Sequence, residues 1–171
     1  MKLTFLRHGT TDLNGKGYIA TKLDYPLNEN GVFECKKIKF DEKDFDAVYC
    51  TPYKRTIQTA EIVFPYKKAV ITPLIIQRDL GELNEKFKKD YLEEYLEKVR
   101  NYTLVPLNAE SLEDIKSRLD KFFKYIKNNH NSNENILIVG HNGIMRIIKK
   151  YYMNENINID TNNLEKFDFY L

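Results

Sequence analysis

Five short runs of apolar, β-branched and aromatic residues recur along the chain, and segments with helical periodicity separate them. The runs span residues 3–6, 47–50, 69–72, 136–139 and 167–171, which is typical of β-strands. The fourth run, residues 136–139, is apolar throughout and therefore predicts a central strand covered on both faces. Strands that alternate with helices predict an α/β fold, a three-layer α/β/α sandwich with a mostly parallel central sheet.

Three apolar stripes at helical spacing account for much of the chain between and after these runs. They lie over residues 92–99, 112–126 and 144–152, and each predicts a helix with one buried face. Ser111 stands where an N-cap is expected, and Asp114 follows three residues later in a pattern close to a capping box. The last strand, residues 167–171, is expected at an edge of the sheet.

Length and composition exclude several classes of protein. The 171 residues predict a single domain over residues 1–171, and a net charge of +2 is too small to indicate nucleic-acid binding. No apolar segment approaches the roughly 20 residues of a membrane helix, so no membrane partner is expected. The N-terminus is interpreted as the first strand and not as a signal peptide, which predicts a cytoplasmic location.

Cys35 and Cys50 form no CxxC motif and are expected to be small buried or half-buried residues outside any disulfide framework.

Histidines and arginines follow three of the predicted strands. The first strand runs into Arg7-His8-Gly9, the fourth into Gly140-His141-Asn142-Gly143, and Arg55 lies in the first turn of a helix after the second. Ligands of parallel sheets bind beyond the carboxyl ends of the strands, so these side chains are expected to converge there. Arginine matches phosphate oxygens, glycine permits close approach, and histidine acts as a nucleophile near neutral pH. The pattern predicts a phosphate site.

Three blocks, residues 6–11, 49–60 and 139–143, resemble the signature motifs of the histidine phosphatase superfamily, in that family's order. The stretch from Asp24 to Gly31 and the pair Glu110-Ser111 also resemble the family, so the resemblance covers nearly the whole chain. It implies a fold like that of phosphoglycerate mutase.

The resemblance also implies roles for individual residues. His8 would carry the phosphoryl group, and Arg7, Arg55 and His141 would surround it. Asn14 would be a further phosphate contact. No metal or other cofactor is implied, because the site has no metal-ligand motif and Arg7 would repel a cation.

Two loop residues differ from the family pattern. Thr21 and Asn142 stand where many relatives carry glycine. Both loops are expected on the substrate side of the site, so these differences bear on the identity of the substrate.

The leaving alcohol needs a proton, and the family takes it from a carboxylic acid after the third strand. Glu82, two residues after Leu80, matches this position best, and Glu85 is the alternative. The stretch around both is altered relative to the family, and an ordinary solvated acidic stretch is also compatible with it.

The expected activity is metal-independent hydrolysis of a small phosphorylated metabolite through phosphohistidine, with α-ribazole phosphate or a sugar phosphate as candidate substrates. The alternatives are a phosphoglycerate mutase and a non-catalytic phosphate-binding protein on the same fold. Residues 85–108 are expected to form a small helical lid, and a small lid favours hydrolysis because it admits water. The sequence does not indicate the oligomeric state.

Overall fold

A computed structural model of the chain describes residues 1–19, 22–155 and 162–171. Its sheet has the order β3-β2-β4-β1-β5. The strands are β1 (Lys2–Arg7), β2 (Ala47–Cys50), β3 (Val70–Ile71), β4 (Asn135–Gly140) and β5 (Lys166–Tyr170). The first four run parallel, and β5 pairs antiparallel with β1 at the edge of the sheet. The predicted α/β class and the mostly parallel sheet are confirmed.

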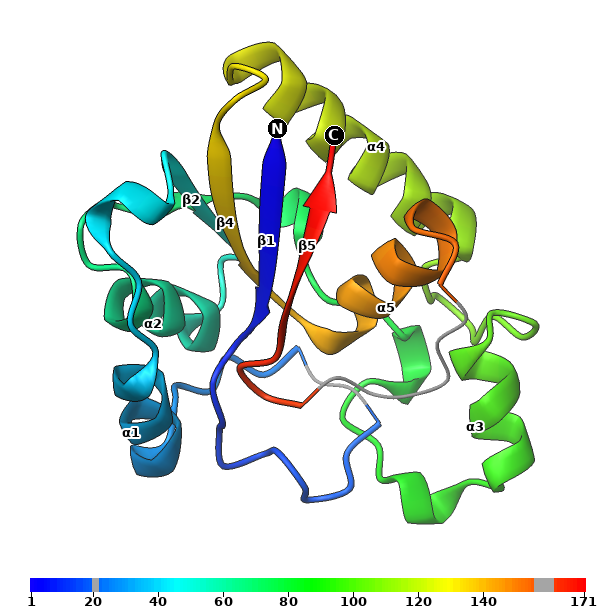
Figure 1. The fold of residues 1–171 in the computed structure, drawn as a ribbon. Helices are drawn as coiled ribbons and strands as arrows, with labels where there is room; N and C mark the ends of the chain where they lie inside the picture. Colours follow the sequence, from blue (N-terminus) through cyan, green and yellow to red (C-terminus); the bar gives the residue numbers. More distant parts are fainter. Residues whose placement is uncertain (20–21, 156–161) are drawn as a thin grey trace.

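Helices cover both faces of this sheet (Figure 1). They are α1 (Glu29–Lys37), α2 (Lys54–Val63), α3 (Glu93–Arg100), α4 (Leu112–Asn129) and α5 (Asn142–Tyr152). Short 3-10 helices lie at Glu42–Asp44, Pro73–Ile75, Gly81–Leu83 and Lys88–Asp90. Helices α1 and α2 pack on one face, α4 and α5 pack on the other, and α3 lies apart from the sheet beyond α5 (Figure 1).

Strand β4 holds the two cores together because its side chains alternate between them. Ile136 and Ile138 pack into the core under α4 and α5, whereas Leu137 and Val139 pack into the core under α1 and α2. All of them are fully buried, as the continuous apolar run predicts. Each buried aliphatic side chain of this size contributes roughly 1.5–3 kcal/mol to folding.

Local sequence signals set the element ends. Ser111 caps α4 in a capping box with Asp114, as predicted. The predicted third strand is shorter than expected, since only Val70 and Ile71 pair and Pro73 begins a 3-10 turn; proline has no N–H with which to continue a ladder. Cys35 and Cys50 are buried and free. In the described part of the chain no helix has the length and apolar character needed to cross a membrane.

Candidate active site

The carboxyl ends of three neighbouring strands form the floor of the site. Because β4 lies between β1 and β2, Arg7 stands beside Gly140 and Cys50 stands beside Val139. The His8 backbone N–H donates to the Gly140 carbonyl at 3.0 Å. The rings of His8 and His141 are therefore brought to a centroid separation of 5.3 Å. The predicted convergence of the strand-end side chains is a property of the parallel sheet.

The protonation of His8 follows from one hydrogen bond. Its Nδ1 lies 2.7 Å from the carbonyl oxygen of Gly9, and a carbonyl only accepts, so Nδ1 carries a proton. Burial lowers the pKa of His8 to about 3, and the charges of Arg55 and Arg7 add to this effect. The ring is neutral at physiological pH, and Nε2 keeps an unprotonated lone pair. His8 has the protonation state that a nucleophile requires.

His141 caps the N-terminus of α5 and is only 2% exposed. Its Nε2 lies 2.9 Å from the Thr51 hydroxyl, at the end of β2. Burial holds the pKa of His141 well below its ordinary value, and the neighbouring charges of Arg55 and Arg7 lower it further. A neutral His141 at a helix N-terminus is compatible with a bound anion, because the backbone N–H groups there point outward.

Arg55 lies in the first turn of α2, as predicted, and is buried. Its guanidinium stacks over the Tyr53 ring at 4.2 Å and donates to the Leu23 carbonyl at 3.1 Å. Burial lowers its pKa, although arginine stays charged. Arg7, at the end of β1, lines the same pocket. Two planar cations therefore stand around the His8 ring.

A threonine on α2 fixes the loop that follows His8. The Thr59 hydroxyl accepts from the Gly9 N–H at 3.0 Å and donates to the Arg55 carbonyl at 2.6 Å. Thr59 is fully buried. One side chain thus links the backbone next to His8 with the backbone of Arg55.

Helix α1 approaches the same loop closely because residue 31 is glycine. A Cβ at Gly31 would lie 2.1 Å from the Thr10 carbonyl oxygen, which is inside contact distance. The loop after β1 is thereby pressed between α1 and α2.

Of the three further binding residues predicted, two line the pocket. The Asn14 Oδ1 accepts from the backbone N–H and the hydroxyl of Thr11, at 2.8 and 3.0 Å. This leaves its Nδ2 as the donor toward an anion. Asn142 lines the pocket as the first residue of α5. Thr21 lies outside the described residues.

The structure does not bring Glu82 or Glu85 to the pocket lining. Glu82 is exposed on the 3-10 turn at Gly81–Leu83, and its N–H donates to the Leu107 carbonyl at 3.2 Å. Gly81 adopts a φ of 56°, and a Cβ there would meet Leu107 O at 2.0 Å. Glu85 is exposed and has a φ of 66°. Their catalytic role stays a prediction.

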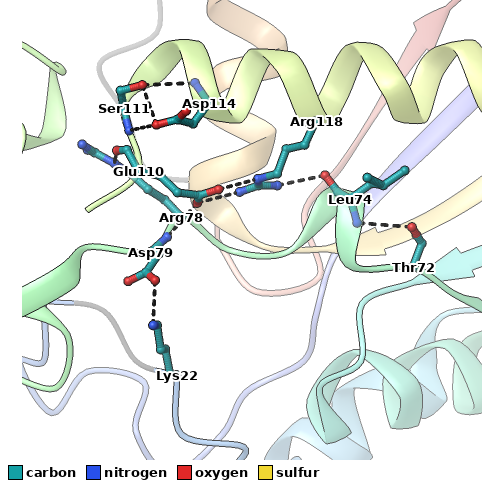
Figure 2. Close-up of polar contacts among 9 residues, drawn as sticks. All are labelled: Lys22, Thr72, Leu74, Arg78, Asp79, Glu110, Ser111, Asp114 and Arg118. Carbon is teal, nitrogen blue, oxygen red and sulfur yellow. Dashed lines mark hydrogen bonds and ion pairs between the residues drawn. The ribbon is translucent and has the colours of Figure 1, made fainter. Parts of the chain in front are cut away.

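A third carboxylate of this stretch, Asp79, is held by several donors. It pairs with Lys22 at 2.6 Å (Figure 2) and accepts from the Gly81 N–H at 2.9 Å and from Asn84 Nδ2 at 2.6 Å. These donors lower the pKa of Asp79, against the opposing effect of partial burial. An acid held in its ionised form is poorly suited to donate a proton.

The pocket above this floor has a volume of about 450 Å³, well within the range for small-molecule sites. Helices α3 and α5 supply much of the rest of its lining, including Leu96, Val99, Arg146 and Lys150. Seven lysines and arginines line the pocket, and no aspartate or glutamate of the described residues does so. Within the same residues, no group of three metal-ligating side chains is present. The site is built for an anion.

The family model of the histidine phosphatase superfamily (branch 1) matches residues 3–167. The chain belongs to this superfamily. Its relatives include "Probable phosphatase C1687.21" of Schizosaccharomyces pombe, 27% identical over 91% of this chain and 75% of the relative. The adenosylcobalamin/alpha-ribazole phosphatase of Salmonella typhimurium is 25% identical over 86% of this chain and 77% of its own length. Phosphoglycerate mutases dependent on 2,3-bisphosphoglycerate are also among the relatives.

A solved structure has the same fold. The mycobacterial glucosyl-3-phosphoglycerate phosphatase superposes with a TM-score of 0.83, covering 98% of this chain and 91% of that one at 16% identity. The predicted phosphoglycerate mutase-like fold is therefore confirmed.

Two buried side chains in or next to the site of this histidine phosphatase were not predicted from the sequence. Thr51 contacts His141, and Arg78 lines the pocket while only 6% exposed. Thr51 follows the second strand directly, so the rule that identified His8 and His141 would have found it. No comparable signal marks Arg78, because burial of an arginine depends on the tertiary packing.

Proposed function

We propose that this phosphatase hydrolyses small phosphate monoesters through a phosphohistidine on His8, without a metal ion. The observation that carries the proposal is the hydrogen bond from His8 Nδ1 to Gly9 O, which leaves Nε2 unprotonated beside two arginines. In the first step Nε2 forms a bond to phosphorus as the phosphorus–oxygen bond to the alcohol breaks. In the second step water attacks phosphorus, the bond to Nε2 breaks, and inorganic phosphate leaves.

The arginines and His141 supply the electrostatic part of this mechanism. The phosphoryl group in transfer spreads its negative charge over three oxygens. Arg7, Arg55, His141 and Asn14 line one pocket with His8, which supports a role for their donors in binding the phosphoryl oxygens with little reorganisation during the reaction. Removing one such preorganised donor typically lowers kcat by 10²- to 10³-fold.

Glu82 is the proposed proton donor to the leaving alcohol and the base for the attacking water. For either role its carboxylate has to turn from the exposed face of its 3-10 turn toward the pocket. Glu85 is the alternative in the same segment. Proton transfer of this kind typically accelerates a reaction by roughly 10²- to 10⁴-fold.

The direct test is release of p-nitrophenol from p-nitrophenyl phosphate in the presence of a strong chelator, for the parent and for His8→Ala. Release by the parent and none by the variant supports the proposal. Release that the chelator abolishes, or that survives in His8→Ala, contradicts it.

A mutase is the second candidate, because mutases are among the sequence relatives. It would return the phosphoryl group from His8 to a bound phosphoglycerate. Incubation with 3-phosphoglycerate separates the two candidates: a phosphatase releases inorganic phosphate, whereas a mutase forms 2-phosphoglycerate. A non-catalytic phosphate-binding protein would form neither and would not be phosphorylated on His8. A cytoplasmic location remains a prediction.

A further inference from the structure

Three buried side chains form a hydrogen-bonded chain beneath the pocket. The Thr56 hydroxyl lies 2.8 Å from the Thr51 hydroxyl, which in turn lies 2.9 Å from His141 Nε2. Thr51 and Thr56 are fully buried, and His141 is only 2% exposed. Thr51 follows β2, Thr56 lies in the first turn of α2, and His141 precedes α5. Since buried polar groups depend on protein partners, the direction of these hydrogen bonds fixes where the protons lie.

The direction of the chain is set at Thr56. Its hydroxyl lies 2.9 Å from the Thr51 carbonyl oxygen and 2.8 Å from the Tyr53 carbonyl oxygen. A carbonyl only accepts and a hydroxyl has one hydrogen, so the Thr56 hydrogen points to these carbonyls. Thr56 Oγ1 is therefore the acceptor of the Thr51 hydrogen. Thr51 Oγ1 has no second hydrogen to give, so it accepts from His141, and His141 Nε2 carries a proton.

The other ring nitrogen of His141 is then without a proton. Burial and the charges of Arg55 and Arg7 hold the pKa of His141 well below its ordinary value, and a neutral imidazole has a single N–H. His8 has the opposite arrangement, with its proton on Nδ1 and a lone pair on Nε2. Because Thr51 occupies Nε2 of His141, Nδ1 is the nitrogen left for a ligand. An unprotonated Nδ1 repels a phosphoryl oxygen, so it can donate only after taking up a proton.

The groups that face His141 decide when it can take up this proton. Those with charged or titratable side chains come from the end of β1, from the start of α2 and from α4; they are Arg7, His8, Tyr53, Arg55 and Arg118. The three arginines disfavour a protonated ring. A phosphate dianion bound among them would offset their charge and raise the pKa of His141.

We infer that Thr51 and Thr56 are positioning residues that fix the proton of His141 on Nε2, and that phosphate binds together with one proton, which His141 holds at Nδ1. A phosphate dianion takes this proton from the solvent, whereas a monoanion brings its own. The new Nδ1–H donates to a phosphoryl oxygen, and Nε2 keeps its bond to Thr51. The inference rests on the proposed function only for the identity of the anion.

Nitrogen-15 NMR of the full chain tests the proton positions, because protonated and bare ring nitrogens have different chemical shifts. The chain has only three histidines, so His8→Ala and His130→Ala assign the signals of His141. In the parent without phosphate we expect a proton on Nε2 of His141 and none on Nδ1. With saturating inorganic phosphate we expect both nitrogens to be protonated.

Two threonine variants should change the phosphate-bound spectrum. Thr51→Val removes the acceptor of the Nε2 proton, and Thr56→Val releases the Thr51 hydrogen, which can then bond to Nε2. In both variants His141 can bind phosphate as a neutral ring with its one proton on Nδ1. Thr51→Ser keeps the hydroxyl and should restore the spectrum of the parent. The matched control is Thr4→Val, a buried threonine of β1 whose hydroxyl donates to Asp168.

Calorimetry counts the protons. Titration with inorganic phosphate at about pH 8.5, above the second pKa of phosphate, is repeated in two buffers with different ionisation enthalpies. The parent, Thr51→Ser and Thr4→Val should take up about one proton for each phosphate bound. Thr51→Val and Thr56→Val should take up close to none. Thr56→Val is the more demanding test, because this side chain is separated from His141 by Thr51.

Three results would overturn the inference. The first is a proton on Nδ1 of His141 in the parent without phosphate. The second is phosphate binding to the parent without proton uptake. The third is proton uptake by the two valine variants equal to that of the parent. If phosphate does not bind, the proposed function fails, and the spectrum of the parent without phosphate still decides the role of the threonines.

Discussion

The phosphate site and the acidic stretch from which we propose the proton donor differ in how the fold holds them. His8, His141 and Arg55 follow strands or open a helix at the sheet edge, and all are less than 8% exposed. The acidic stretch from Asp79 to Glu85 lies on a 3-10 turn, and two of its carboxylates are exposed. The residues around His8 are therefore preorganised by the core, whereas the proposed proton donor belongs to a surface segment. Substituting a residue near His8 should therefore lower the catalytic activity more than substituting one in the acidic stretch.

The largest expected effect is on Arg55. Arg55→Ala should lower kcat/KM by roughly 10²- to 10³-fold, because a fixed cation at the transferring phosphoryl group is lost. Its neighbour Lys54 is exposed, so Lys54→Ala is the matched control and should stay within about threefold. Steady-state kinetics with p-nitrophenyl phosphate measures both. Similar losses in the two variants would contradict the placement of the phosphate.

The acidic stretch can be tested through the leaving group. Glu82→Gln should lower kcat/KM, which reports the phosphorylation of His8, by about 10²-fold for an alkyl phosphate, since an alkoxide must be protonated as it leaves. The loss should be much smaller for p-nitrophenyl phosphate, whose leaving group is already stable as an anion. Glu85→Gln should change neither rate by more than about threefold. The reverse pattern would assign the acid to Glu85, and the absence of any leaving-group dependence would exclude both.

Folding stability should depend on pH through the buried histidines. The folded-state pKa of His8 is about 3 and that of His141 is also lowered, so between pH 3 and 6.5 the unfolded chain binds more protons than the folded one. The contribution of both histidines to stability is therefore complete above about pH 6.5 and falls as the pH drops, by roughly 1.4 kcal/mol per pH unit for His8 and in the same direction for His141. Urea unfolding of the parent and of His8→Gln measures this slope.

The variant removes the contribution of His8, so its slope should be shallower by roughly 1.4 kcal/mol per pH unit. An unchanged slope would mean that His8 does not titrate at a depressed pKa. His8→Gln also removes the proposed nucleophile, but unfolding does not depend on activity.

The smallest expected effect concerns the packing of helix α1 against the loop that follows β1. Gly31→Ala places a Cβ at 2.1 Å from Thr10 O, and forcing an atom into packed structure typically costs 1–3 kcal/mol. Gly140→Ala is the control, because no heavy atom lies within 4 Å of its Cβ position. Thermal unfolding should show a clear loss of stability for Gly31→Ala and only a small change for Gly140→Ala.

The same contrast explains what could be predicted from the sequence. The strands, the edge position of β5, the capping box at Ser111 and the convergence of His8 and His141 follow from local patterns and from the geometry of parallel sheets. Three features do not follow from such patterns: the Gly9 carbonyl as the partner of His8, the burial of Arg78, and the position of Glu82 outside the pocket lining. Each depends on backbone geometry or on distant packing, such as the contact between Gly81 and Leu107.

Phosphorylation of His8 tests the central claim most directly. The protein would be mixed with a phosphate monoester, quenched in alkali within the first turnover, and digested for mass spectrometry. One phosphoryl group on the peptide that contains His8, absent from His8→Ala and retained in a variant of the third histidine, His130→Ala, is the expected result. Turnover without any phosphohistidine, or a phosphoryl group on another residue, would contradict the account.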